Sequence, residues 1–297
     1  MIYDIKLRIG YDYTSPVGGG RHVVRVLPLE IPGEQRVIAS LLSVSPEPEE
    51  KRDRTDFFGN GVTEFALRRP HGAISVTAQC RVERVLRHFA PREAVAGTSL
   101  GALAAEVGGC RDLGPSSPVH FAAPSARVPY NAQMTQFATM QLHDGMTAAE
   151  AVVAIGRALH AHMKFDPRAT TVDTPAADAF ARRRGVCQDF SHIMIACLRG
   201  IGIPAGYVSG YLRTLPPKGQ PRLEGADAMH AWVRAWCGAE RGWVTFDPTN
   251  DIPVGIDHVT VAHGRDYADV SPIRGILRIS GSQTGHQAVD MRPVLPA

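Results

Sequence analysis

The first 84 residues alternate between apolar and polar side chains with a period of two. Residues 2–13 place isoleucine, leucine or tyrosine at every second position, with charged residues between them, which is typical of a half-buried strand. Similar short runs separated by proline- or glycine-bearing turns recur at 22–27, 35–44, 61–67 and 73–82. The polar stretch 53–60 predicts a turn. Because no helical pattern intervenes, we expect an N-terminal antiparallel β-sandwich over residues 1–84.

Beyond this region the apolar positions take up a helical period. Residues 85–128 mix short helical segments with proline and glycine, and predict a linker with accessory helices and loops. Residues 129–280 carry helices followed by strands, and residues 281–297 have a weak apolar pattern that predicts a C-terminal tail. The chain is therefore expected to be an α+β protein with a separate core after the sandwich.

Two helix starts before the central motif carry capping signals. Thr147 and Glu150 have the spacing of a capping box, with a helical run after them. Thr174 is followed by Pro175, which predicts a second cap with proline at the first helical position. The second helix would deliver the chain to the next motif.

Cys187 stands where a polar run ends and an apolar helical pattern begins. The apolar positions recur at three- and four-residue steps and predict one buried helix face, made of Phe190, Met194, Cys197, Leu198 and Ile201. Gly200, Gly202 and Pro204 end this helix. Cys187 therefore lies at the helix N-terminus, where free backbone N–H groups and the helix dipole stabilise a thiolate, the form that acts as a nucleophile.

Two strands further along bring a histidine and an aspartate toward each other. Residues 229–237 and 243–247 alternate with period two, and a glycine-flanked turn predicts that they pair as a hairpin. A turn centred on residues 237–240 places His230 directly opposite Asp247. A turn centred on residues 239–241 offsets the pair by about three residues, and a bulge would then be needed to bring the side chains together.

Composition and charge exclude several classes of protein. The net charge is +3 and no basic run exceeds three residues, which argues against a nucleic-acid partner. No apolar run approaches the length of a membrane span, and the N-terminus has no signal-peptide pattern, so we expect a cytoplasmic protein without a membrane partner. The five cysteines are scattered without CxxC spacing, which argues against disulfides and a thiolate metal site. We predict neither a metal nor a cofactor, and the pattern specifies no oligomeric state.

Several blocks of the chain together resemble the bacterial transglutaminase-like family, which has a papain-like core with residues in the order cysteine, histidine, aspartate. The resemblance covers nearly the whole chain and is poorest over residues 84–128. The core blocks that carry it are Gly185-Val186-Cys187-Gln188-Asp189-Phe190, Gly202–Tyr211, His230-Ala231-Trp232 and Gly242–Asn250, and the outer ones are Val261–Tyr267, Tyr11-Asp12-Tyr13 and Phe57-Phe58-Gly59-Asn60.

The resemblance implies a β-sandwich joined to an α+β core, in which the cysteine helix packs on an antiparallel sheet. It implies Cys187 as nucleophile, His230 as general base and then acid, and Asp247 as the residue that orients His230. The implied reaction is acyl transfer through a thioester, with a peptide or protein as substrate. Water as acceptor gives a cysteine protease or amidase acting on peptide, isopeptide or related amide bonds. An amine acceptor gives a transglutaminase, and a binding module on the same fold is a third alternative.

Other residues have less specific expectations. The backbone N–H of Cys187 is a candidate oxyanion donor because it lies at a helix terminus, and Gln188 is a second candidate. Trp232 and Trp243 are candidates for shaping a substrate cleft. We interpret Asp189 as a helix-cap partner and His192 as structural. Cys197 and Cys237 fall on apolar faces and are expected to be core thiols.

Overall fold

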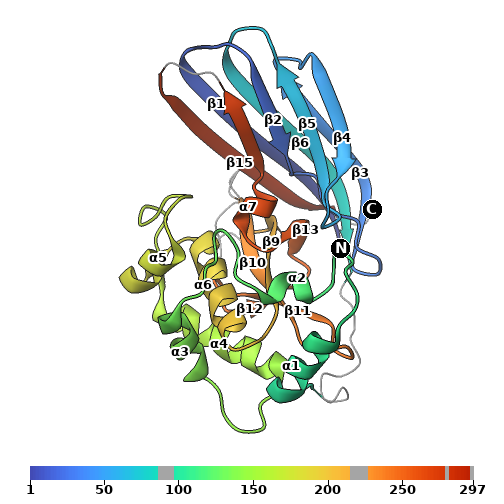
Figure 1. Cartoon of the computed structure of the whole chain (residues 1–297). Coiled ribbons are helices and arrows are strands. Elements are labelled where there is room, and N and C mark those ends of the chain that lie inside the picture. The colour runs from blue at the N-terminus through green and yellow to red at the C-terminus, as the bar shows by residue number, and fades with distance from the viewer. Residues whose placement is uncertain (86–96, 215–226, 278–280, 295–297) are drawn as a thin grey trace, which may run out of the picture.

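The computed structural model describes residues 1–85, 97–214, 227–277 and 281–294 (Figure 1). The chain forms antiparallel sheets together with a group of helices. Seven helices occur in the described part of the chain: α1 (Leu100–Gly109), α2 (Val119–Ala122), α3 (Ala132–Thr139), α4 (Ala148–His162), α5 (Ala176–Arg182), α6 (Cys187–Gly200) and α7 (Tyr267–Val270). The predicted α+β class with antiparallel sheets is therefore correct.

Two four-stranded antiparallel sheets contain the N-terminal strands. The first has the order β15 (Gln283–Val294), β1 (Ile2–Val17), β6 (His71–Arg84), β3 (Gln35–Ser45). The second has the order β14 (Ile273–Leu277), β2 (Gly20–Val24), β5 (Gly61–Leu67), β4 (Glu50–Thr55). Along β1 the apolar side chains are buried and the charged ones exposed, as the alternation predicts. Buried residues of both sheets belong to one hydrophobic core.

Strand β4 was not expected from the sequence, which predicts a turn beginning at Asp53. All six residues of β4 are exposed, and five of them are charged. An edge strand with solvent on both faces needs no apolar alternation, and charged side chains protect its free edge from further pairing. The strand is therefore specified by its pairing with β5 rather than by its own pattern.

The predicted division of the C-terminal part is wrong. Residues 281–297 were expected to form a tail, but β15 pairs with β1 from Ile2↔Val294 to Tyr13↔Gln283. Strand β14, which lies inside the range predicted for the core, pairs with β2. The red C-terminal strands accordingly run among the blue N-terminal strands (Figure 1). The two ends of the chain complete the same pair of sheets.

The second part of the molecule is built on a five-stranded antiparallel sheet. Its order is β12 (Ile252–Pro253), β11 (Trp243–Asp247), β10 (Ala228–Trp236), β9 (Ala205–Leu212), β13 (His258–Gly264). Helix α6 contacts β9 and β10, and also α3, α4 and α5. Every residue from Gln188 to Leu198 is buried, so α6 is a central helix enclosed on all sides rather than a helix with one buried face.

The helix caps were predicted with mixed success. The Thr147 hydroxyl accepts a hydrogen bond from the Glu150 backbone N–H, and the Glu150 carboxylate accepts from the Thr147 N–H, so the predicted capping box is present. The predicted Thr174 cap is absent, because α5 has Pro175 at its N-cap. The Thr174 hydroxyl instead accepts from the Thr171 N–H, in the loop before the helix.

Two amide side chains join the N-terminal strands to the five-stranded sheet. Gln35 donates to the Thr260 carbonyl and accepts from the Thr260 N–H, at 2.7 and 2.8 Å. Asn60 makes the same pair of hydrogen bonds to His263, at 2.8 and 2.7 Å. Both partners lie on the edge strand β13, so the amides satisfy backbone groups that a further strand would otherwise bind. Within the described ranges, no helix is long and apolar enough to cross a membrane.

Candidate active site

Cys187 is the first residue of α6, and the start of this helix is held by several contacts. The two residues before Val186 form β8 (Arg184–Gly185), which pairs with β7 (Lys164–Phe165). The Asp189 carboxylate accepts hydrogen bonds from the Val186 N–H at 2.8 Å and the Thr170 hydroxyl at 2.6 Å. Burial raises the pKa of Asp189 even though both hydrogen bonds favour the ionised form. Asp189 is therefore a cap partner, as predicted, and it fixes the position of the helix start.

His230 and Asp247 meet across the hairpin, but in neither of the two predicted registers. The observed pairs run from Val233↔Phe246 to Trp236↔Trp243. One further step along this register places Asp247 opposite Trp232, so His230 is its diagonal neighbour, two residues away on the same face. The diagonal is short enough for the side chains to meet without a bulge: His230 Nε2 lies 2.7 Å from Asp247 Oδ2.

Asp247 is fully buried and collects hydrogen bonds from several groups. Its Oδ2 also accepts from the Asn250 amide at 2.7 Å and lies 3.2 Å from His258 Nε2. Its Oδ1 accepts from the backbone N–H groups of Thr249 and Asn250, at 3.0 and 3.2 Å. Burial opposes ionisation of this carboxyl, but the hydrogen bonds with His230 and His258 hold its pKa well below the usual value. Asp247 is therefore a carboxylate that presents negative charge to His230.

The cysteine and the histidine interact as well. Burial disfavours the charged imidazole, but the hydrogen bond to Asp247 and the interaction with Cys187 raise the pKa of His230 to about 10. Because Asp247 occupies Nε2, the other ring nitrogen, Nδ1, is the one left for the thiol. The structure thus brings Cys187, His230 and Asp247 into one electrostatic group at the start of α6.

The side-chain amide of Gln188 is directed at a backbone carbonyl and not at a site for an oxyanion. Its side-chain amide donates to the Val172 carbonyl at 3.0 Å, and Arg127 Nη1 donates to the same carbonyl at 2.9 Å. Gln188 therefore holds the loop before α5 against the start of α6. Together with the Asp189–Thr170 hydrogen bond, this gives both residues after Cys187 a role in holding that loop.

The two tryptophans predicted to shape a cleft lie in different environments. Trp232 is fully buried, and its ring stands edge-on to His258 with 5.1 Å between centroids. It packs beside the site and has no exposed surface for a substrate. Trp243 is at the far end of β11 from Asp247, and its indole N–H donates to the Ser116 carbonyl. Its ring lies 4.3 Å from the guanidinium carbon of Arg234, and a role for Trp243 in shaping a substrate cleft stays a prediction.

Cys187 differs from the deeply buried thiols of the chain. Cys80, Cys197 and Cys237 are buried, and burial raises the pKa of each thiol to about 12. Cys187 and Cys110 are half-buried. His192 is buried and accepts a hydrogen bond from the Tyr267 N–H, which agrees with the predicted structural role. Burial lowers the pKa of His192 to about 4, so its ring is neutral.

The residues that the sequence reasoning missed are His258 and Asn250. Asn250 follows Asp247 by three residues and could have been suspected from that spacing, since a turn after a strand folds the chain back. His258 stands 11 residues after Asp247, at the start of β13. It had no signal in the sequence, because its approach depends on how β13 lies relative to β11.

His230, Asp247 and His258 are residues of the types that bind zinc. One ligand atom each of His230, Asp247 and His258 lie within 4.8 Å of one another. The carboxylate oxygen already serves both histidines, and its 2.7 Å separation from His230 Nε2 is a hydrogen-bond length. A shared zinc ion would stand about 2.0–2.2 Å from each ligand and hold them farther apart. We therefore interpret the cluster as a hydrogen-bond network.

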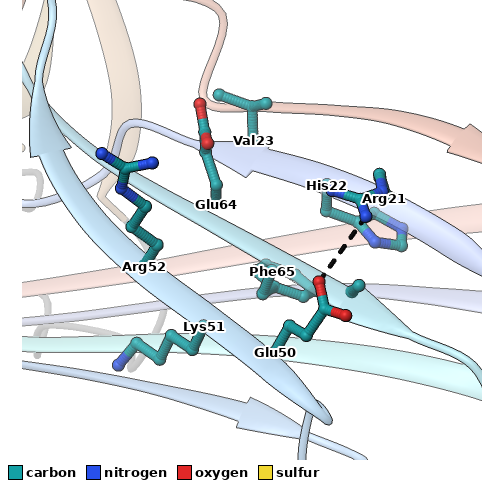
Figure 2. A pocket seen from close by; sticks show the side chains of 9 residues that line it. Arg21, His22, Val23, Glu50, Lys51, Arg52, Glu64 and Phe65 are labelled. Carbon is teal, nitrogen blue, oxygen red and sulfur yellow. Dashed lines mark ion pairs between the residues drawn. The ribbon is translucent and has the colours of Figure 1, made fainter.

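A surface pocket also lies in the N-terminal sheets, away from Cys187. It has a volume of about 340 Å³ and is lined by residues of β2, β4 and β5. Figure 2 shows the Arg21–Glu50 ion pair, at 3.6 Å, beside His22 and Phe65. The exposed, mixed charges of this pocket contain no group that resembles the Cys187 arrangement.

The geometry agrees with two family models that match the chain. Residues 3–83 match the bacterial transglutaminase-like N-terminal region, and residues 135–248 match the transglutaminase-like superfamily. An uncharacterised protein of Mycobacterium leprae is 34% identical over 272 residues, which cover 90% of this chain and 90% of that protein. This chain belongs to the bacterial transglutaminase-like family.

Further relatives agree with this assignment. An uncharacterised protein of Mycobacterium tuberculosis is 32% identical over 256 residues, which cover 82% of this chain and 77% of that protein. The crystal structure of a proposed cysteine protease from Cytophaga hutchinsonii has the same fold, with a TM-score of 0.74 over 100% of this chain and 92% of that chain. Its sequence identity is 20%, so this likeness concerns the fold.

Proposed function

We propose that this protein catalyses thiol-dependent acyl transfer on amide bonds, with Cys187 as nucleophile. The observation that supports it is the group at the start of α6: a half-buried cysteine that interacts with a histidine, whose Nε2 is hydrogen-bonded to a buried carboxylate. This is the arrangement that nucleophilic catalysis by cysteine requires, namely a nucleophile, a base and a group that orients the base. We also infer that the two N-terminal sheets form a β-sandwich and that α6 is the nucleophile helix.

The proposed chemistry follows from the positions of these groups. The His230 imidazolium holds Cys187 as a thiolate, which attacks the amide carbonyl and forms a tetrahedral intermediate. The backbone N–H of Cys187, free at the helix terminus, stabilises the oxyanion. His230 then donates its proton to the leaving amine as the C–N bond breaks, which leaves a thioester on Cys187 and a neutral imidazole.

The second half of the reaction decides the class of enzyme. When water is the acceptor, His230 takes its proton as the water attacks the thioester; the C–S bond then breaks, which releases a carboxylic acid and returns Cys187 as the thiolate. We propose this hydrolysis, on a peptide, isopeptide or related amide, in the cytoplasm. When a primary amine is the acceptor, the product is a new amide and the protein is a transglutaminase. A third hypothesis, a binding module for a protein partner, is favoured by no contact in the structure.

Selective alkylation tests whether Cys187 is an activated thiol. In the native protein at neutral pH, iodoacetamide should modify Cys187 at least about tenfold faster than Cys110, the other half-buried cysteine. Peptide mapping by mass spectrometry measures both rates in the same sample. Comparable rates at the two cysteines would contradict the proposed activation. In His230→Ala the rate at Cys187 should fall to that of Cys110, because the thiolate loses its counter-ion.

Substrate assays separate the three hypotheses. Hydrolysis predicts cleavage of members of a peptide and isopeptide library, lost in Cys187→Ala. A transglutaminase instead incorporates a biotin-labelled primary amine into a glutamine-bearing protein such as casein, with the same loss in Cys187→Ala. Turnover in neither assay, by a protein whose Cys187 is also unreactive, would leave the binding module as the remaining hypothesis.

A further inference from the structure

The structure places a second histidine on the carboxylate of the proposed catalytic group. His258 comes from β13, whereas Asp247 comes from β11 and His230 from β10. His258 is 1% exposed, and its Nε2 lies 3.2 Å from the same Asp247 oxygen that contacts His230. Three separate strands thus converge on one oxygen atom.

The protonation of His258 follows from its other neighbour. The Gly255 backbone N–H points at His258 Nδ1, at 3.3 Å. A backbone N–H can only donate, so Nδ1 is the acceptor and carries no hydrogen. The hydrogen of the neutral ring is then on Nε2 and is directed at Asp247. His258 is therefore a neutral donor to the carboxylate, whose tautomer is fixed by a main-chain group.

This donor constrains the direction of the carboxylate. His258 Nε2 and the Asn250 amide contact the same oxygen, Oδ2, that His230 contacts, so three donors together hold this oxygen in place. The backbone N–H groups of Thr249 and Asn250 hold the second oxygen. Rotation of the Asp247 side chain away from His230 would break hydrogen bonds in a fully buried site, which is costly.

We propose that His258 is a positioning residue, which fixes Asp247 so that its carboxylate stays on His230 and keeps that imidazole charged beside the Cys187 thiolate. This inference rests on the proposed function and assigns His258 an indirect role, since it contacts neither Cys187 nor a substrate. The titratable groups around Asp247 and His230 include Cys187 from α6, and Tyr207 from β9 and Tyr267 from α7 interact in turn with Cys187.

The alternative is that His258 only fills space against Trp232. Its ring packs edge-on to that indole, and a buried ring at this position contributes to packing whatever its hydrogen bonds. The packing role and the positioning role predict different effects of replacing His258. Loss of packing lowers stability, whereas loss of the donor lets Asp247 move and therefore lowers the pH at which His230 gives up its proton.

The experiment compares two alkylating agents at Cys187 over a range of pH. Iodoacetate is an anion and is favoured over iodoacetamide only while the His230 imidazolium is present, so the ratio of the two rates falls as His230 deprotonates. In the wild-type protein this fall should be centred near pH 10. In His258→Phe, which keeps a ring against Trp232 but has no donor, the midpoint should fall by roughly one pH unit.

Two further variants make the result specific. His258→Gln keeps an amide donor and should recover at least half of the shift. His22→Phe also replaces a buried histidine, one stacked on Phe65 in the N-terminal sheets, and should leave the midpoint unchanged. Thermal unfolding of each variant, followed by circular dichroism, shows the packing effect separately.

An unchanged midpoint in His258→Phe, with a lowered melting temperature alone, would overturn the positioning role and support the packing role. If His258→Phe does not fold, His258→Met, which also lacks a donor, takes its place: a midpoint lowered by roughly one pH unit supports the proposal, and a wild-type midpoint overturns it. Failure of the proposed function looks different, because the wild-type protein would then show no pH-dependent preference for iodoacetate.

Discussion

At the scale of single residues, the partners of a buried side chain determine whether it carries charge. Buried Asp247 stays ionised because its hydrogen bonds outweigh the desolvation of the carboxylate. His230 stays protonated for the same reason, whereas at buried His192 the attraction of Asp266 does not outweigh burial and the ring is neutral. The three thiols deep in the core stay protonated, since no cation is close enough to compensate for burial. The environment, rather than residue type, separates the reactive groups from the structural ones.

The raised pKa of His230 predicts a pH-dependent stability. A histidine with a pKa near 10 in the folded protein and about 6.5 in the unfolded chain stabilises the fold fully below pH 6.5. This contribution is lost as the pH rises through about 10. Urea unfolding should therefore show a free energy of unfolding that falls between pH 7 and pH 10 by roughly a few kcal/mol. In His230→Gln this part of the slope should disappear, and an identical slope in both proteins would contradict the assignment.

His192 predicts the opposite dependence in a separate pH range. Its pKa is lowered to about 4 in the folded protein, so its contribution is present above pH 6.5 and is lost as the pH falls toward 4. His192→Gln should therefore be less sensitive to acid than the wild-type protein between pH 6.5 and pH 4. Urea unfolding at pH 7 and pH 4.5 measures the difference, and the alkaline range serves as its internal control.

At the scale of elements, strand register and close packing place the site. The diagonal contact between His230 and Asp247 depends on the register of the β10–β11 hairpin, which the sequence alone does not specify. Strand β10 also packs tightly on the neighbouring strand β9, where Gly210 lies opposite His230. A Cβ at Gly210 would stand 2.3 Å from the Trp232 ring and 2.3 Å from the Val259 carbonyl oxygen.

Gly210→Ala should therefore disturb the site through packing. One of its clashes is with backbone, which cannot rotate away, so we expect a loss of about 1–3 kcal/mol in the free energy of unfolding. Alkylation of Cys187 should slow as well, since Trp232 supports His258. Urea unfolding and the alkylation rate measure the two effects.

Gly101→Ala is the matched control for this change. Gly101 lies in α1 with open space around its Cβ position, so alanine there should be neutral or stabilising by up to about 1 kcal/mol. Equal stabilities of Gly210→Ala and the wild-type protein would show that β9 can move away from Trp232.

At the scale of the whole molecule, the two ends of the chain stabilise each other. Strand β15 adds to the first sheet beside β1, and its Val289 and Met291 side chains are fully buried. The Met291 N–H also donates to the Asp227 carboxylate, next to β10. The C-terminal strand thus contacts both the N-terminal sheet and the start of the strand that carries His230.

Met291→Ala tests the contribution of this strand. Deleting a fully buried methionine side chain should cost about 2–5 kcal/mol in the free energy of unfolding. Gln287→Ala, at an exposed position of the same strand, should change stability by less than about 0.5 kcal/mol. Thermal unfolding measures both. Equal melting temperatures for the two variants would mean that the C-terminal strand contributes little to the fold, as the sequence pattern had suggested.

The sequence was informative wherever the signal was local. Alternation predicted β1, helical spacing placed Cys187 at the start of α6, and the Thr147–Glu150 spacing predicted a cap that is present. The sequence was uninformative for strands that form only because a neighbouring strand pairs with them. Strand β4 has no alternation because both of its faces are exposed, and β15 has little apolar pattern because only two of its twelve side chains are buried.

By itself, the sequence of this protein determined the chemistry that is available: a cysteine at a helix N-terminus, and a histidine and an aspartate on neighbouring strands. These follow from short-range rules, since helix starts and strand alternation depend on residues a few positions apart. The tertiary structure alone decided which partners meet. The diagonal His230–Asp247 contact, the donor His258 from a third strand and the orientation of Gln188 toward Val172 all join elements distant in the sequence. Contacts of this kind depend on register and packing, for which no local pattern exists.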